Sequence, residues 1–178
     1  MINKILVALN THEPYMHIFN QALDLAKATG AELKLLSILS TVYDYTMPVE
    51  YYPGTMGYAM PMSDTFWDAY EAEQLKEKES VLNMLCELRE QAKGQGVHAE
   101  IIQMTGDPGV VICDRAKTEQ IDLIVVGSHR RRGLDELLVG SVSSYVMHRA
   151  ACSVMIVHDH AVPAHAATPE TATTAAAL

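Results

Sequence analysis

Short runs of apolar residues alternate along the chain with longer stretches in which apolar residues recur every three or four positions. Short branched runs are typical of strands covered on both faces, and the wider spacing is typical of helices with one buried face. The apolar runs predict five strands, at residues 4–9 (KILVAL), 33–39, 97–103, 123–126 (LIVV) and 153–157 (SVMIV).

The stretches between these runs predict four helices. Gly30 is a plausible C-terminal cap for the first helix, and Asp107 and Pro108 form a plausible start for the third. In the long second helix, four leucines are expected to face inward: Leu75, Leu82, Leu85 and Leu88. The helices are predicted at residues 14–29, 66–93, 108–118 and 141–149.

This alternation of strand and helix predicts an α/β fold with a doubly wound, five-stranded parallel sheet. In such sheets ligands bind beyond the carboxyl ends of the strands, where the winding direction reverses. The chain has 178 residues, enough for one domain but few for two. We expect one domain over residues 1–160, followed by an Ala/Thr/Pro-rich tail at 161–178 that is disordered.

Residues 40–65 interrupt the pattern with five tyrosines, four methionines and three prolines. A stretch this long and this aromatic is expected to be a structured loop or flap rather than a linker. It could cover a ligand, contact a partner, or pack on the surface of its own domain. The sequence leaves these three roles open.

Charge and cysteine content narrow the classes of function. The formal net charge of −9 argues against a nucleic-acid or membrane-surface partner. No apolar run approaches the roughly 20 residues of a membrane span, and the amino terminus lacks the apolar core of a signal peptide. Cys86, Cys113 and Cys152 are scattered and form no Cys-x-x-Cys pair, which favours reduced thiols over a metal or disulfide role. We therefore expect a cytoplasmic protein.

Candidate chemistry gathers in residues 126–143. The predicted strand at 123–126 leads into Gly127, whose missing side chain lets a ligand approach the backbone. Gly140 and Ser141 then open a helix, and free amides with a hydroxyl at a helix start form a natural phosphate site. The arginines at 130–132 could donate to phosphate oxygens. The alternative is a surface loop with a glycine turn and solvated arginines.

No catalytic or metal site is predicted. The chain offers no convincing Ser/His/Asp or Cys/His set and no Gly-Lys-Ser/Thr phosphate loop. His158, His160 and His165 lie near one another in sequence but have no accompanying cluster of cysteines or carboxylates. A solvated strand end explains these histidines more simply than a metal site does.

The spacing Gly-x2-Gly-x9-Gly-Ser/Thr after a buried strand resembles that of the universal stress protein family, and Gly127, Gly140 and Ser141 match it. Four longer segments are also similar to that family: KILVALN, ALDLAKATGAEL, GDPGVVICDRAKTEQIDLIVVG and VVGSHRRRGLDELLVGSVSSYVMHRAACSVMIV. The resemblance covers about residues 2–157, leaving only the 40–65 segment variable and the tail outside.

The resemblance implies a Rossmann-like nucleotide-binding fold with strand order 3-2-1-4-5, and a homodimer formed through the last strand. It implies ATP bound between the ends of the first and fourth strands. By position, the base and sugar would lie against Ala8, Leu9, Asn10, Ile38, Val126, Gly127 and His129. The phosphates would lie among Arg130, Gly140, Ser141, Val142 and Ser143.

Two positions depart from the family pattern. Arg130 stands where the motif has its second glycine, so its side chain either clamps the phosphates or fills their space. Asn10 stands where the family has an acidic residue, and its amide bonds a ribose more weakly than a carboxylate does. The ligand is therefore left as ATP, ADP, AMP or a cyclic nucleotide, which Mg²⁺ could accompany.

We interpret the chain as an adenine-nucleotide-binding stress-response regulator that acts on an unidentified protein partner, with at most slow ATP hydrolysis. Arg130 and Asn10 at motif positions leave a second hypothesis open, a nucleotide-independent interaction module of the same fold. An enzyme acting on a small adenylated substrate is a third.

Overall fold

The computed structural model describes residues 1–11, 15–39, 64–128 and 140–158. Its five strands form one sheet in which every neighbouring pair is parallel, in the order β3-β2-β1-β4-β5. This confirms the predicted doubly wound sheet and its order. The strands are β1 (Lys4–Ala8), β2 (Glu32–Leu39), β3 (Ala99–Thr105), β4 (Leu123–Ser128) and β5 (Ser153–His158).

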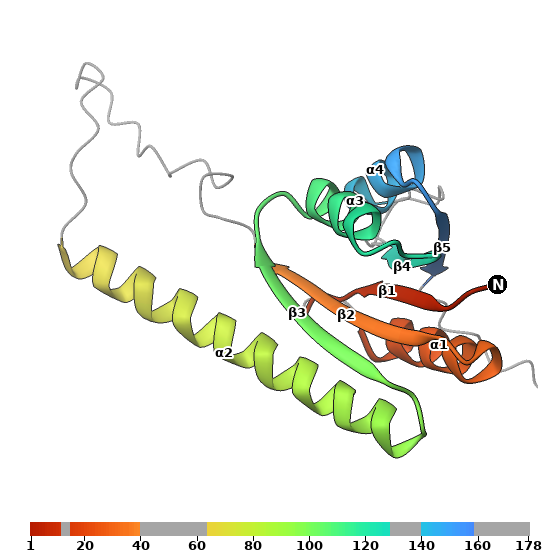
Figure 1. Cartoon of the computed structure of the whole chain (residues 1–178). Coiled ribbons are helices and arrows are strands. Elements are labelled where there is room, and N and C mark those ends of the chain that lie inside the picture. Colours follow the sequence, from red (N-terminus) through yellow and green to blue (C-terminus); the bar gives the residue numbers. More distant parts are fainter. Residues whose placement is uncertain (12–14, 40–63, 129–139, 159–178) are drawn as a thin grey trace, which may run out of the picture.

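Four helices cover the two faces of this sheet. Figure 1 shows α1 and α2 on one face and α3 and α4 side by side on the other. The predicted bounds of the last two helices are confirmed, and Gly30 ends the first helix with a positive φ of 74°. The helices are α1 (Tyr15–Thr29), α2 (Asp64–Gly94), α3 (Pro108–Thr118) and α4 (Ser141–Arg149).

The alternation of side chains along the strands divides the core into two apolar layers. On β1, Ile5 and Val7 pack with α1 and α2, whereas Leu6 packs on the other face with α3 and α4. On β4 the same alternation places Val125 in the first layer and Val126 in the second. Both faces of the central strands are thus covered, as their unbroken apolar runs predict.

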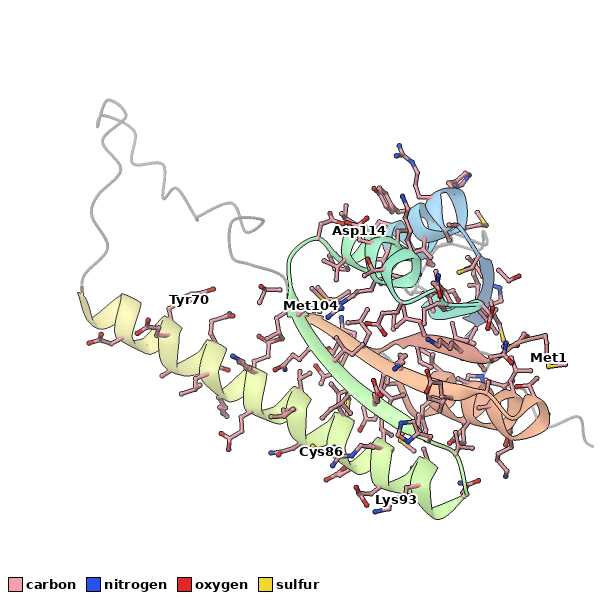
Figure 2. The ribbon with its side chains drawn as sticks, in the orientation of Figure 1. Met1, Tyr70, Cys86, Lys93, Met104 and Asp114 are labelled. Carbon is pink, nitrogen blue, oxygen red and sulfur yellow. The ribbon has the colours of Figure 1, made fainter. Side chains whose placement is uncertain are left out.

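The inward face of α2 differs from the prediction. Leu85 and Leu88 are buried as expected, but Leu75 is 67% exposed and Leu82 is 41% exposed, so these two assignments were wrong. The residues that pack toward the sheet recur at three- and four-residue spacing: Val81, Met84, Leu85, Leu88 and Ala92. Leu82 lies about 100° round the helix from Val81. In Figure 2 the end of α2 that carries Tyr70 extends beyond the sheet, whereas the end with Cys86 and Lys93 runs beside it.

At the amino edge of the sheet, carboxylates organise the strand starts. The Asp122 carboxylate accepts hydrogen bonds from the backbone N–H groups of Asn3, at 2.7 Å, and Lys4, at 3.0 Å. These two bonds hold the pKa of Asp122 below its ordinary value. The buried Lys34 ammonium donates to Glu100 at 2.6 Å. This edge is therefore occupied by the protein's own charges.

Two predicted features lie outside the described residues: most of the 40–65 segment, and the tail at 161–178. Within the described part of the chain, no helix is long and apolar enough to cross a membrane.

Candidate functional site

The winding of the sheet reverses between β1 and β4. Strands β2 and β3 lie on one side of β1, and β4 and β5 lie on the other. The chain crosses from the first side to the second through α3, between β3 and β4. Because parallel strands all end at one edge, the ends of β1 and β4 meet the starts of α3 and α4 there. This is the position at which doubly wound sheets bind ligands.

Helix α4 begins at this edge without a side-chain cap. Its N-cap residue is Gly140, with φ −56° and ψ 158°, and no side chain bonds the first-turn amides among the described residues. The Gly140 carbonyl oxygen accepts hydrogen bonds from the Ser144 N–H, at 2.8 Å, and the Ser143 hydroxyl, at 3.2 Å. The first N–H groups of a helix have no partner within it, and the helix dipole favours an anion there.

The side chains of this first turn differ in how far they are exposed. Ser141 is exposed, Val142 packs on the α3–α4 layer, and Ser143 is 2% exposed with its hydroxyl turned back to Gly140. Ser141 can therefore offer both its amide and its hydroxyl to a ligand, whereas Val142 and Ser143 offer their amides. The start of α4 therefore presents amide and hydroxyl donors at this edge of the sheet, and that they hold a phosphate stays a prediction.

The predicted residues at the end of β1 lie at the same edge but face different layers. Ala8 is half-buried and pairs with Leu36, and the Leu9 N–H donates to the Leu36 carbonyl at 2.9 Å. The Leu9 side chain is 3% exposed in the layer formed with α1 and α2, so its backbone is what it presents to the edge. Asn10 is exposed, and Ile38 packs beside the α3–α4 layer.

On β4, Val126 pairs with Ile156 and its side chain is buried under α3 and α4. Gly127 is half-buried and pairs with Val157, so the strand runs two residues past its predicted end at 126. Gly127 thus remains within the sheet while reaching its carboxyl edge. His129 and Arg130, the other two predicted contacts, lie outside the described residues.

One contact at this edge was missed by the sequence analysis. The Ser128 oxygen Oγ lies 2.8 Å from Nδ1 of His158, and the two residues are paired across β4 and β5. Ser128 is 7% exposed and gains a hydrogen-bond partner that a buried hydroxyl needs. The strand register could have predicted this contact, because Ser128 and His158 are the last residues of two adjacent parallel strands. His158 therefore ties the end of β4 to the edge strand.

The chemistry of the described residues is that of anion binding by backbone amides. No group of three or more His, Cys, Asp and Glu side chains in the described ranges could hold a metal ion. The three cysteines are free, and burial raises the pKa of both Cys113 and Cys152, which keeps these thiols protonated.

Solved structures share this architecture. A universal stress protein from Lactobacillus plantarum matches with a TM-score of 0.67 and 20% identity, covering 88% of this chain and 97% of the other. A universal stress protein in complex with cAMP matches with a TM-score of 0.57 and 22% identity, covering 88% and 97%. One from Archaeoglobus fulgidus in complex with dAMP matches at 0.53 and 19%, covering 88% and 98%. Likeness at this level of identity establishes the shared fold.

Sequence relatives and a family model establish the family as well as the fold. The chain is 34% identical to universal stress protein YxiE of Bacillus subtilis over 157 residues, which cover 88% of this chain and 99% of the relative. It is 33% identical to universal stress protein Sll1388 of Synechocystis over 160 residues, covering 86% and 96%. The model of the universal stress protein family matches residues 1–158. The chain therefore belongs to the universal stress protein family.

Proposed function

We propose that the protein binds an adenine nucleotide with its phosphates at the start of α4, between the carboxyl ends of β1 and β4. The observation that carries this proposal is the uncapped first turn of α4 at the point where the sheet reverses its winding. Phosphate oxygens would accept from the amides of Ser141, Val142 and Ser143 and complete the turn as a capping side chain would. Gly140 and Gly127 leave the backbone open to close approach.

The rest of the nucleotide would lie along the strand ends. Ala8 and Ile38 offer small and apolar side chains beside the α3–α4 layer, and Asn10 would bond the sugar. Family members solved with cAMP and dAMP favour an adenine base with at least one phosphate. ATP and ADP stay within the proposal, because Arg130 would neutralise further phosphates, with or without Mg²⁺.

A regulator rather than an enzyme fits this site best. The described residues provide amide donors at the α4 start, and nucleotide binding would alter the binding of a protein partner. We further propose a homodimer in the cytoplasm, formed through β5, which stands at the end of the sheet and pairs only with β4 in the described chain. Light scattering would show twice the monomer mass of 19.6 kDa; a monomer at micromolar concentration would contradict the dimer.

The decisive experiment identifies the ligand directly. Purified protein is denatured and any released nucleotide is identified by mass spectrometry, and ATP, ADP, AMP and cyclic AMP are then titrated by calorimetry. We expect at least one to bind. The Gly140→Trp variant, with an indole at the proposed phosphate site, should lose that binding, and Gly94→Trp, on open surface at the end of α2, should retain it. Absence of binding by all four nucleotides would overturn the proposal.

A further inference from the structure

We propose that Gly109 is a positioning residue for the nucleotide site: by letting α3 approach Tyr145 of α4 closely, it sets where the first turn of α4 stands. This inference rests on the proposed function, because it concerns the amides that would bind the phosphates. Gly109 lies outside the residues predicted to contact nucleotide, and it acts through Tyr145 rather than on a ligand.

The evidence is the space around Gly109. A Cβ atom at this position would lie 2.8 Å from Cδ1, 2.9 Å from Cγ and 3.2 Å from Cβ of Tyr145. Contacts under 3.0 Å are closer than packed carbon atoms tolerate. Gly109 is buried in the first turn of α3, where glycine is a poorer helix former than alanine. The close approach of α4 explains why a glycine stands at this position of α3.

Tyr145 cannot relieve the contact by turning its ring alone. Rotation about the Cα–Cβ bond moves Cγ and Cδ1, but it leaves Cβ in place 3.2 Å from the new atom. The ring also lies under the Arg149 guanidinium, whose central carbon is 5.5 Å from the ring centroid. A methyl group on Gly109 would therefore displace α4 as well as the ring.

A displacement of α4 reaches the candidate site directly. Tyr145 lies one turn after Ser141, in a helix whose Ser143 and Val146 are buried against the rest of the protein. A helix moves as a stiff unit over one turn, so a shift at Tyr145 moves the amides of Ser141 and Val142. Hydrogen bonds to phosphate depend steeply on distance and angle. The spacing of α3 and α4 would thus set nucleotide affinity.

The test enlarges residue 109 of α3 and then shortens residue 145 of α4 to compensate. We expect Gly109→Ala to weaken nucleotide binding about tenfold, as a misplacement of well under 1 Å can. The Gly109→Ala/Tyr145→Gly double variant removes all three contacting atoms of residue 145, Cβ, Cγ and Cδ1, and should recover most of that loss. Gly94→Ala is the matched control, because its new methyl group meets nothing within 4 Å, and its affinity should equal that of the unaltered protein.

Amide chemical shifts of α4, recorded without nucleotide, supply the second measurement. Gly109→Ala should move the signals of residues 141–143, and the double variant should return them toward their original positions. Unchanged affinity in Gly109→Ala, or a double variant as weak as the single one, would overturn the positioning role. Failure of the unaltered protein to bind any nucleotide would overturn the proposed function itself, and the positioning role with it, even where the amide shifts respond as expected.

Discussion

Helices α3 and α4 begin at the same edge of the sheet and pack against each other, yet their first turns are completed differently. In α3 the Asp107 carboxylate accepts a hydrogen bond from the Val110 N–H at 3.0 Å, and Pro108 follows as the first helical residue. In α4 the equivalent position is Gly140, which provides no side chain to do this. One helix start carries its own anion, and the N-cap residue of the other carries none.

This difference separates two tasks that the same edge performs. The capped start of α3 is complete without a ligand and can serve as a support, on which α4 rests through Gly109 and Tyr145. The uncapped start of α4 gives up the stability that an Asp or Ser cap provides there, and this cost is recovered only when an anion binds. Under the proposed function, nucleotide binding would complete the start of α4 beside the already completed start of α3.

Giving α4 a cap like that of α3 should abolish the difference and produce the largest effect. Gly140 has a negative φ of −56° with ψ 158°, a backbone conformation that Asp adopts without strain. In Gly140→Asp the new carboxylate would take the amides that phosphate needs and repel the phosphate. We expect nucleotide affinity to fall about a hundredfold, from the loss of charge-assisted hydrogen bonds. The free energy of unfolding without ligand should rise by a few tenths of a kcal/mol.

Calorimetric titration and thermal unfolding of the same samples measure the two effects together. The informative result is their opposite signs, because a merely disruptive substitution would lower both affinity and stability. Gly140→Ala is the control: it adds bulk without a carboxylate. If Gly140→Asp bound nucleotide as tightly as the unaltered protein, the phosphates would lie elsewhere than at the start of α4.

Removing the cap of α3 is the converse change, with a smaller effect of a different kind. Asp107→Ala leaves the Val110 N–H without its bond and should lower the free energy of unfolding by about 1 kcal/mol. Nucleotide affinity should stay almost unchanged, since Asp107 belongs to the support and not to the phosphate site. Chemical denaturation and titration measure the two quantities, and Asp107→Asn should keep most of the stability. A large loss of affinity in Asp107→Ala would show that the Asp107 cap itself, and not only the Gly109 contact, positions the start of α4.

The sequence places the first residues of α3 and α4 equally well, but only the chemistry of the α3 start follows from local residues. Asp107, Pro108 and the helix that follows are adjacent in the chain, and a cap is formed by residues three positions apart. The motif residues Gly127 and Gly140, in contrast, lie 13 positions apart, one within β4 and the other at the start of α4. Their spacing pointed to the site through a family resemblance, while periodicity alone left a solvated surface loop as an alternative.

Other features depend on contacts that no local pattern contains. The inward face of α2 was assigned from leucine spacing, but the sheet selects the stripe that carries Val81 and Met84 and leaves Leu75 beyond its edge. The Gly109–Tyr145 contact joins residues 36 positions apart, and the Ser128–His158 contact joins residues 30 apart. Such pairs depend on strand register and helix spacing, which the sequence specifies only through the complete fold.

A carboxylate at the opposite edge of the sheet, Asp122, gives the smallest expected effect and the one that depends on pH. Asp122 accepts from the N–H groups of Asn3 and Lys4, which lower its pKa from the ordinary value of 3.8. A carboxyl group whose pKa is lowered by folding stabilises the protein above its unfolded-state pKa, and loses that contribution as the pH falls through the lowered native value. Asp122→Asn should therefore unfold at a lower temperature at neutral pH, and the gap to the unaltered protein should close below about pH 4. Asp24→Asn, which removes an exposed carboxylate from α1, controls for the change in net charge. A gap that stayed constant down to pH 2 would mean that the charge of Asp122 contributes nothing to stability, and that the two proteins differ only in the uncharged contacts of residue 122.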